Sequence, residues 1–83
     1  MPLPYKLGSH GPEILAWQKW FKRYAKSYAP PVDGYYGNDE VVAVNEMRKR
    51  LGMPPGDFDA AVASRVAYLY EPAQVAPRIP TYV

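Results

Sequence analysis

The densest group of possible metal ligands in this sequence is a set of carboxylate and amide side chains between positions 33 and 40: Asp33, Asn38, Asp39 and Glu40. Oxygen ligands of this kind suit a calcium ion. Their spacing, however, lacks the alternating acids and the closing glutamate of an EF-hand loop. A turn and a helix start explain the same residues, so we predict no metal site.

Catalytic side chains form no recognisable constellation. His10 is the single histidine, and no serine or threonine has a credible histidine–acid partner in the sequence. No carboxylate pair has a catalytic context, and the absence of cysteine excludes thiolate chemistry and cysteine-based zinc sites. We therefore predict that this chain is not an enzyme and needs no cofactor.

The stretch with the clearest binding chemistry runs from Asp33 to Asn38. Asp33-Gly34 predicts a tight turn, and Asn38 offers an N-cap oxygen to the helix that follows. Because alternate residues face opposite ways, we expect one of the rings of Tyr35 and Tyr36 to enter the core and the other to face solvent or a ligand. This loop is therefore the first place to look for ligand contact.

Three helices must hold this turn. The first is predicted over residues 12–28, with Pro12 at its first position, and ends before Pro30-Pro31. Its buried stripe has helical spacing: Ile14, Trp17, Gln18, Phe21, Tyr24, Ala25 and Tyr28. Trp20 falls beside this stripe, where a core-edge or interdomain contact is favoured over a sugar platform, and the Gln18 amide is expected to brace loop backbone.

The second helix is predicted to start at Asn38 and to stop before Gly52. It buries a stripe formed by Val41, Val44, Met47 and Leu51. A third, short helix is predicted after Asp59 as its cap, with apolar positions at Val62, Val66 and Leu69 and with Phe58 packing ahead of it. Pro31–Gly37 and Pro54–Asp59 read as an imperfect repeat, in which a turn of proline, glycine and acid precedes a helix.

Size and composition bound the function. Eighty-three residues with a net charge of +2 allow one small domain and argue against a nucleic-acid arm. No apolar run has the length of a membrane span, and no secretory signal is recognisable. The three predicted helices indicate an all-α domain over residues 1–70. The prolines after position 71 predict a proline-rich linker over residues 71–83, leading to a further domain.

The pattern resembles the three-helix peptidoglycan-binding domain of endolysins, amidases and other wall hydrolases, over roughly residues 7–70. The matching residues are Gly8, Gly11, Ile14, Trp17-Gln18 and Phe21, the loop Asp33-Gly34-Tyr35-Tyr36-Gly37, and Ala43-Val44. Glu40, Met47-Arg48 and Asp59 depart from the family pattern. Among hosts of such domains, the chain is similar to the N-terminal segment of mycobacteriophage lysins, including the lysin B esterases.

The resemblance implies a non-catalytic targeting module in a small three-helix bundle. Its partner would be peptidoglycan or a related wall polymer, with a covalently attached catalytic domain. The host protein would be made in the bacterial cytoplasm and act at the wall after release. The resemblance also gives Tyr36 the buried aromatic position of the family and leaves Tyr35 exposed. The candidate ligand-binding set is Tyr35, Tyr36, Asn38, Trp20, Gln18, Asp33 and Arg48.

Two alternatives stay open. A helical DNA-binding domain would use Arg48, Lys49 and Arg50 on phosphate, although basic residues also collect at helix ends because of the dipole. A protein-docking domain would use the aromatic patch as its interface.

Overall fold

The computed structural model describes residues 3–68, and within that range the chain is all-α. It contains the helices α1 (Pro12–Tyr24), α2 (Asn38–Arg50) and α3 (Ala60–Arg65), with a 3-10 turn, η1 (Lys26–Tyr28), after α1. Among these residues the extended backbone forms no named strand, only two isolated β-bridges. The predicted linker over residues 71–83 and Leu69 lie outside the described residues.

The first helix is shorter than predicted. α1 begins with Pro12 in its first turn, as expected, but ends at Tyr24 because Ala25 leaves the helical region, with φ −141° and ψ 65°. The chain then tightens into η1, which sets the Tyr28 ring against Phe21 at a centroid distance of 5.8 Å. Extended backbone at Ala29, required before Pro30, prevents the helix from continuing.

Two assignments on the first helix are wrong. Trp20, placed beside the buried stripe, is a core residue with 6% of its surface exposed. Tyr24, placed within the stripe, is 48% exposed and lies over the Trp20 ring at 5.1 Å. Trp20 is buried because Phe58 and Tyr68, which come from much later in the chain, contact its ring at 5.8 and 4.9 Å.

The second helix has the predicted bounds but a different N-cap. Gly37 is the capping position and Asn38 is the first helical residue, so the expected Asn38 cap is wrong. The Gly37 N–H donates instead to Glu40 Oε1 at 2.8 Å, which is the glutamate half of a capping box. At the other end Gly52 has φ 74°, and Met53 N–H donates to the Arg48 carbonyl at 2.8 Å, as in a Schellman motif.

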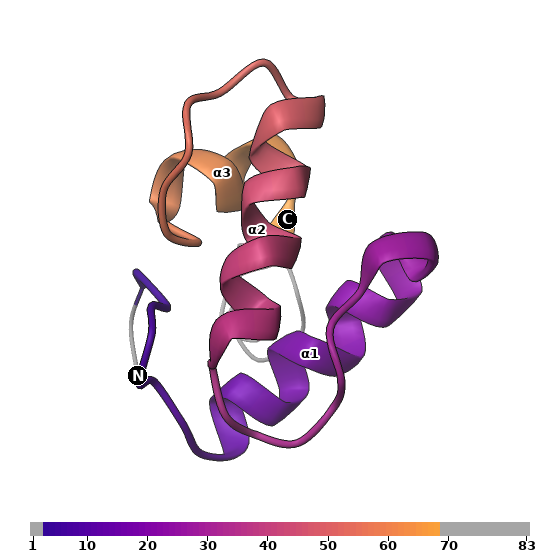
Figure 1. The fold of residues 1–83 in the computed structure, drawn as a ribbon, viewed down its shortest axis with the longest axis vertical. Helices are drawn as coiled ribbons and strands as arrows, with labels where there is room; N and C mark the ends of the chain where they lie inside the picture. The colour runs from indigo at the N-terminus through magenta and orange to yellow at the C-terminus, as the bar shows by residue number, and fades with distance from the viewer. Residues whose placement is uncertain (1–2, 69–83) are drawn as a thin grey trace, which may run out of the picture.

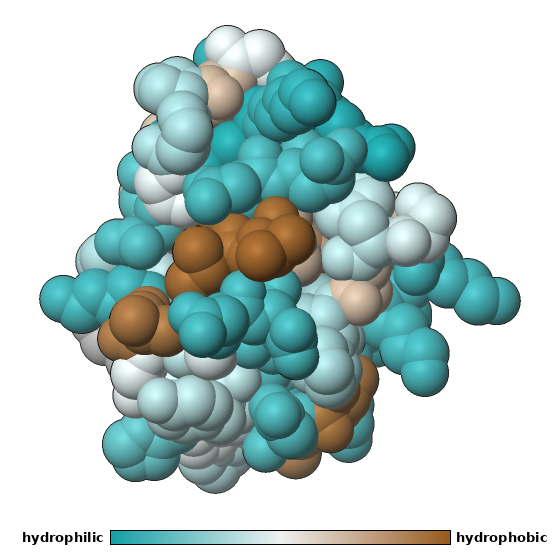
Figure 2. Space-filling view, in the orientation of Figure 1, coloured by the Kyte–Doolittle hydropathy of each residue, from teal (hydrophilic) through white to brown (hydrophobic). Residues whose placement is uncertain are grey.

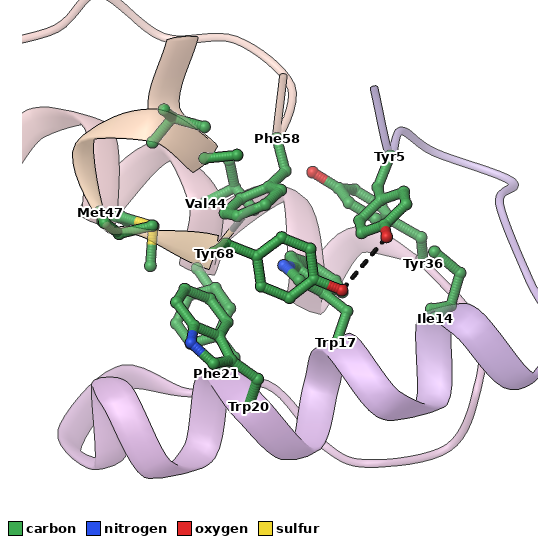
Figure 3. Close-up of a cluster of buried hydrophobic side chains, with 14 residues drawn as sticks. Tyr5, Ile14, Trp17, Trp20, Phe21, Tyr36, Val44, Met47, Phe58 and Tyr68 are labelled. Carbon is green, nitrogen blue, oxygen red and sulfur yellow. Dashed lines mark hydrogen bonds between the residues drawn. The ribbon is translucent and has the colours of Figure 1, made fainter. Parts of the chain in front are cut away.

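The core combines aromatic rings from the N-terminal segment, α1, the two loops and the chain after α3 with aliphatic side chains from the three helices (Figure 3). Trp17 stacks on Tyr36 at 5.3 Å with the ring planes 4° apart, and Phe58 lies 5.2 Å from Trp17. As predicted, Val44 and Met47 from α2 are fully buried, and so are Val62 and Phe58 around α3. The Asp59 carboxylate accepts from Val62 N–H at 3.1 Å and caps α3, also as predicted.

The N-terminal segment closes this core. Figure 1 shows it running beside the loop that precedes α3. Tyr5 and Phe58 exchange two backbone hydrogen bonds of 3.0 and 3.1 Å, and the Tyr5 ring is fully buried. Its hydroxyl donates to Glu13 Oε2 at 2.5 Å and lies 3.2 Å from the Tyr68 hydroxyl. Burial and the carboxylate bond both raise the pKa of Tyr5 above its usual value.

Candidate functional site

The turn at residues 33–37 is held by one buried amide. Gln18, fully buried on α1, accepts backbone N–H bonds from Asp33 and Gly34 through Oε1 at 2.9 and 2.7 Å. Its Nε2 lies 3.1 Å or less from three acceptors: Asp33 Oδ1, the Tyr35 carbonyl and Glu40 Oε2. The predicted role of Gln18 as a brace for loop backbone is confirmed.

The same turn separates the two tyrosines as expected. Asp33 Oδ1 accepts from Tyr35 N–H at 3.0 Å, and Gly34 takes φ 79°, which favours glycine. Tyr35 is 50% exposed, whereas Tyr36 is 1% exposed and packs flat on Trp17. Burial raises the pKa of Tyr36 above its usual value.

The Tyr35 ring lies over Gly37. A Cβ at Gly37 would sit 3.2 Å from the ring, so a side chain at this position would push the ring away by a few tenths of an ångström. Backbone bonds on the other side fix the turn to the N-terminal segment, with Tyr36 N–H to the Ser9 carbonyl at 2.8 Å and Gly8 N–H to the Tyr36 carbonyl at 2.9 Å. Tyr35 is therefore displayed on a backbone that is bonded from both sides.

The second loop is braced in the same way by Arg48. This arginine is 7% exposed and donates to the carbonyls of Pro54 and Asp57 at 2.6 and 2.7 Å, and to Asp59 Oδ1 at 3.2 Å. A Cβ at Gly56 would lie 2.9 Å from the guanidinium carbon. In both halves of the imperfect repeat, a buried polar side chain from the preceding helix fastens the loop that leads into the next helix.

The candidate residues thus divide by exposure. Tyr35, Asn38 and Asp33 are exposed, whereas four residues are buried: Gln18, Trp20, Tyr36 and Arg48. The buried four act on the surface only through the backbone and rings that they hold in place. Two of the three basic residues at the end of α2 are likewise engaged in protein contacts: Arg48 as described, and Arg50, which pairs with Glu46 at 2.7 Å and lies 4.5 Å above the Tyr28 ring.

Sequence reasoning missed a groove along the exposed side of α2. It has a volume of about 440 Å³ and lies between η1 with its following prolines and α2; we call it the α2 groove, lined by Tyr28, Ala29, Pro30, Pro31, Asp39, Val42, Ala43, Glu46 and Arg50. Val42, 70% exposed, also lines a second hollow of about 470 Å³ toward Met53 and Pro55. Figure 2 shows an apolar patch surrounded by hydrophilic side chains over the middle of α2.

The α2 groove begins one residue from the predicted site, because Asp39 follows Asn38 directly. The sequence did offer one signal for this groove. Asp39 and Val42 lie one and four residues after Asn38, on the exposed side of a helix whose other face is buried. Among residues 3–68, no group of three or more His, Cys, Asp or Glu could hold a metal ion. None of the helices described there combines the length and apolar character that a bilayer crossing requires.

Comparison with known proteins adds no relative: no family model, curated protein or solved structure matches the chain.

Proposed function

We propose that this chain is a non-catalytic cell-wall-binding module, which holds a linked hydrolase on peptidoglycan or a related wall polymer. The observation that carries the proposal is the Gln18-braced turn, which presents the half-exposed Tyr35 ring next to the start of α2 and its groove. The similarity of Asp33-Gly34-Tyr35-Tyr36-Gly37 to the loop of peptidoglycan-binding domains supports the same function.

The chemistry of this surface suits a glycan chain with attached peptide. An exposed tyrosine provides a flat apolar face with a polar tip. The α2 groove adds a second ring at Tyr28, an exposed apolar side chain at Val42 and polar groups at Asp39 and Glu46. An open surface of this size binds one polymer segment with modest affinity, and its benefit is to raise the local concentration of a tethered enzyme.

Co-sedimentation with purified insoluble peptidoglycan tests the proposal. The experiment is run at about 0.5 M salt, where ionic contacts are strongly screened. The chain should pellet with the wall. Tyr35→Ala should reduce the bound fraction several-fold, and Val42→Glu should do the same by placing a charge in the α2 groove.

Tyr24→Ala is the matched control, since Tyr24 has nearly the same exposed fraction as Tyr35 but lies at the end of α1. It should leave wall binding at high salt unchanged. Thermal melts verify that all three variants are folded. If the unmodified chain stays in the supernatant, or if Tyr24→Ala and Tyr35→Ala behave alike, wall binding through this surface is refuted.

A further inference from the structure

A row of lysines crosses the outer face of α1 and η1. Lys19, Lys22 and Lys26 are all exposed. A step of three residues places Lys19 and Lys22 on one face of α1, and Lys26, which begins η1 after the break at Ala25, lines the same hollow as Lys22. Figure 2 shows long hydrophilic side chains projecting at the right of the molecule, where α1 ends in Figure 1. We call Lys19, Lys22 and Lys26 the lysine face.

The positive charge of the lysine face is not neutralised by ion pairs within residues 3–68. The ion pairs found there join Arg48 to Asp59 and Arg50 to Glu46. Asp33, the acid nearest in sequence after this row, already accepts bonds from the Gln18 amide and the Tyr35 N–H. The three ammonium groups are therefore free to meet an anion from outside.

The lysine face also borders a hollow that leads toward the α2 groove. Lys22 and Lys26 line a depression of about 390 Å³ together with residues 29–32. Ala29, Pro30 and Pro31 line the α2 groove as well, so the two hollows lie on either side of this short segment. A chain crossing the segment would pass from ammonium groups to the Tyr28 ring.

We propose that the lysine face binds an anionic wall polymer, a glycan chain bearing phosphate or carboxylate groups, whose uncharged sugar portion continues into the α2 groove. The proposal rests on the proposed wall-binding function and adds the charge class of the ligand. Lysine ammonium groups act as point charges that bind phosphate or carboxylate without requiring a fixed orientation, which suits a flexible repeating anion.

A nucleic-acid ligand fits these observations less well. The net charge of +2 is small, and the neighbouring α2 groove has Asp39 and Glu46 on its walls. A nucleic acid carries a phosphate on every nucleotide and would bring negative charge against these two acids, whereas the uncharged sugar portion of a wall polymer would not.

The test compares the full chain with a triple variant, Lys19→Gln, Lys22→Gln and Lys26→Gln. The control, Lys6→Gln with Lys49→Gln, removes exposed lysines outside this face. The first probe is end-labelled inorganic polyphosphate, measured by fluorescence anisotropy between 50 and 200 mM salt. Three phosphate contacts predict a loss of affinity of about 10- to 50-fold across this range. In the triple variant the loss should shrink to about threefold or less, while the control should keep most of it.

The second probe is insoluble cell wall, either untreated or stripped of its phosphodiester-linked polymers by cold aqueous acid. Poly-glutamate, which carries carboxylate groups, serves as a soluble competitor. At low salt the unmodified chain should prefer untreated wall, and the triple variant should bind both walls equally. A duplex DNA of matched charge that competes better than either polyanion would overturn the proposal in favour of a nucleic-acid surface.

Other outcomes separate this inference from the function on which it rests. Equal binding of both walls by the unmodified chain, or equal weakening by the triple variant and the control, refutes the lysine face while wall binding stands. If the unmodified chain binds polyphosphate but neither wall, then both the wall-binding function and the assignment of a wall polymer to this face are refuted.

Discussion

Replacing Gln18 by leucine should test how the binding turn is held. The substitution keeps the approximate size of the side chain and removes all of its polar contacts. Two backbone N–H groups, at Asp33 and Gly34, lose an acceptor, and the Glu40 carboxylate, 2% exposed, loses a donor at 2.7 Å. The folded state must then leave these groups unpaired or admit water to them.

The expected cost follows from the burial of these partners. An unpaired buried polar group costs roughly 1–3 kcal/mol, and a hydrogen bond to a charged group contributes about 1.5–3 kcal/mol. Asp33 and Gly34 are partly accessible, so water can replace part of what their N–H groups lose. We expect Gln18→Leu to lower the free energy of unfolding by about 3–5 kcal/mol, comparable to the whole stability of a domain of this size.

Urea unfolding followed by fluorescence of the buried Trp17 and Trp20 measures this loss. Asn45→Ala is the control, because it removes a single exposed acceptor, for Gly56 N–H at 3.1 Å, and should cost under about 1 kcal/mol. The double variant Gln18→Leu with Glu40→Leu should cost less than the sum of the single variants, because no buried carboxylate is then left without its partner. A Gln18→Leu variant as stable as Asn45→Ala would refute the proposed bracing of the turn.

Three further predictions concern the scaffold. Arg48→Met should lower the free energy of unfolding by about 2–4 kcal/mol, because the carbonyls of the second loop lose their donors; rescue by Arg48→Lys to the native midpoint in urea would contradict this. Phe21→Ala should cost roughly 3–5 kcal/mol, whereas Tyr35→Ala should leave the thermal midpoint nearly unchanged; the reverse result in thermal melts would exchange their roles. Because burial raises the pKa values of Tyr5 and Tyr36 in the folded state, their stabilisation is complete below the pKa of an unfolded tyrosine and is lost as pH rises above it. The free energy of unfolding measured with urea should therefore fall above pH 10, by up to about 1.4 kcal/mol per pH unit for each tyrosine, and Tyr36→Phe should make the fall less steep; a free energy of unfolding independent of pH up to 12 would refute this.

The sequence was sufficient where a local rule decides the structure. Alternation in the turn correctly predicted one buried and one exposed tyrosine, the resemblance correctly chose Tyr36 as the buried one, and helix-end rules correctly gave Pro12, Gly52 and Asp59 their positions. The role of Gln18 followed from a polar side chain lying within an apolar stripe.

The sequence was insufficient where a distant segment of the chain decides whether a residue is buried. Trp20 is buried by Tyr68 and Phe58, and Tyr5 enters the core by pairing with Phe58, none of which is visible from helical periodicity. The role of Arg48 as a brace for the second loop was not predicted. Two of its acceptors are backbone carbonyl oxygens, which every residue has, so no sequence pattern marks them. The α2 groove depends on how η1 folds back, which the expected longer helix would have prevented.

The pairing of Tyr5 with Phe58 also sets the order in which parts of the fold form while the chain is synthesised. α1, the Gln18-braced turn and α2 form contacts between near neighbours in the chain, whereas the Tyr5 hydroxyl reaches a partner 63 residues away. Closing a long loop costs entropy before any contact is gained. A chain emerging from the ribosome can therefore form the turn that displays Tyr35 before Phe58 packs beside Trp17. The core is completed only when Phe58 and α3 arrive, and the N-terminal segment and α3 should then pack together in one step.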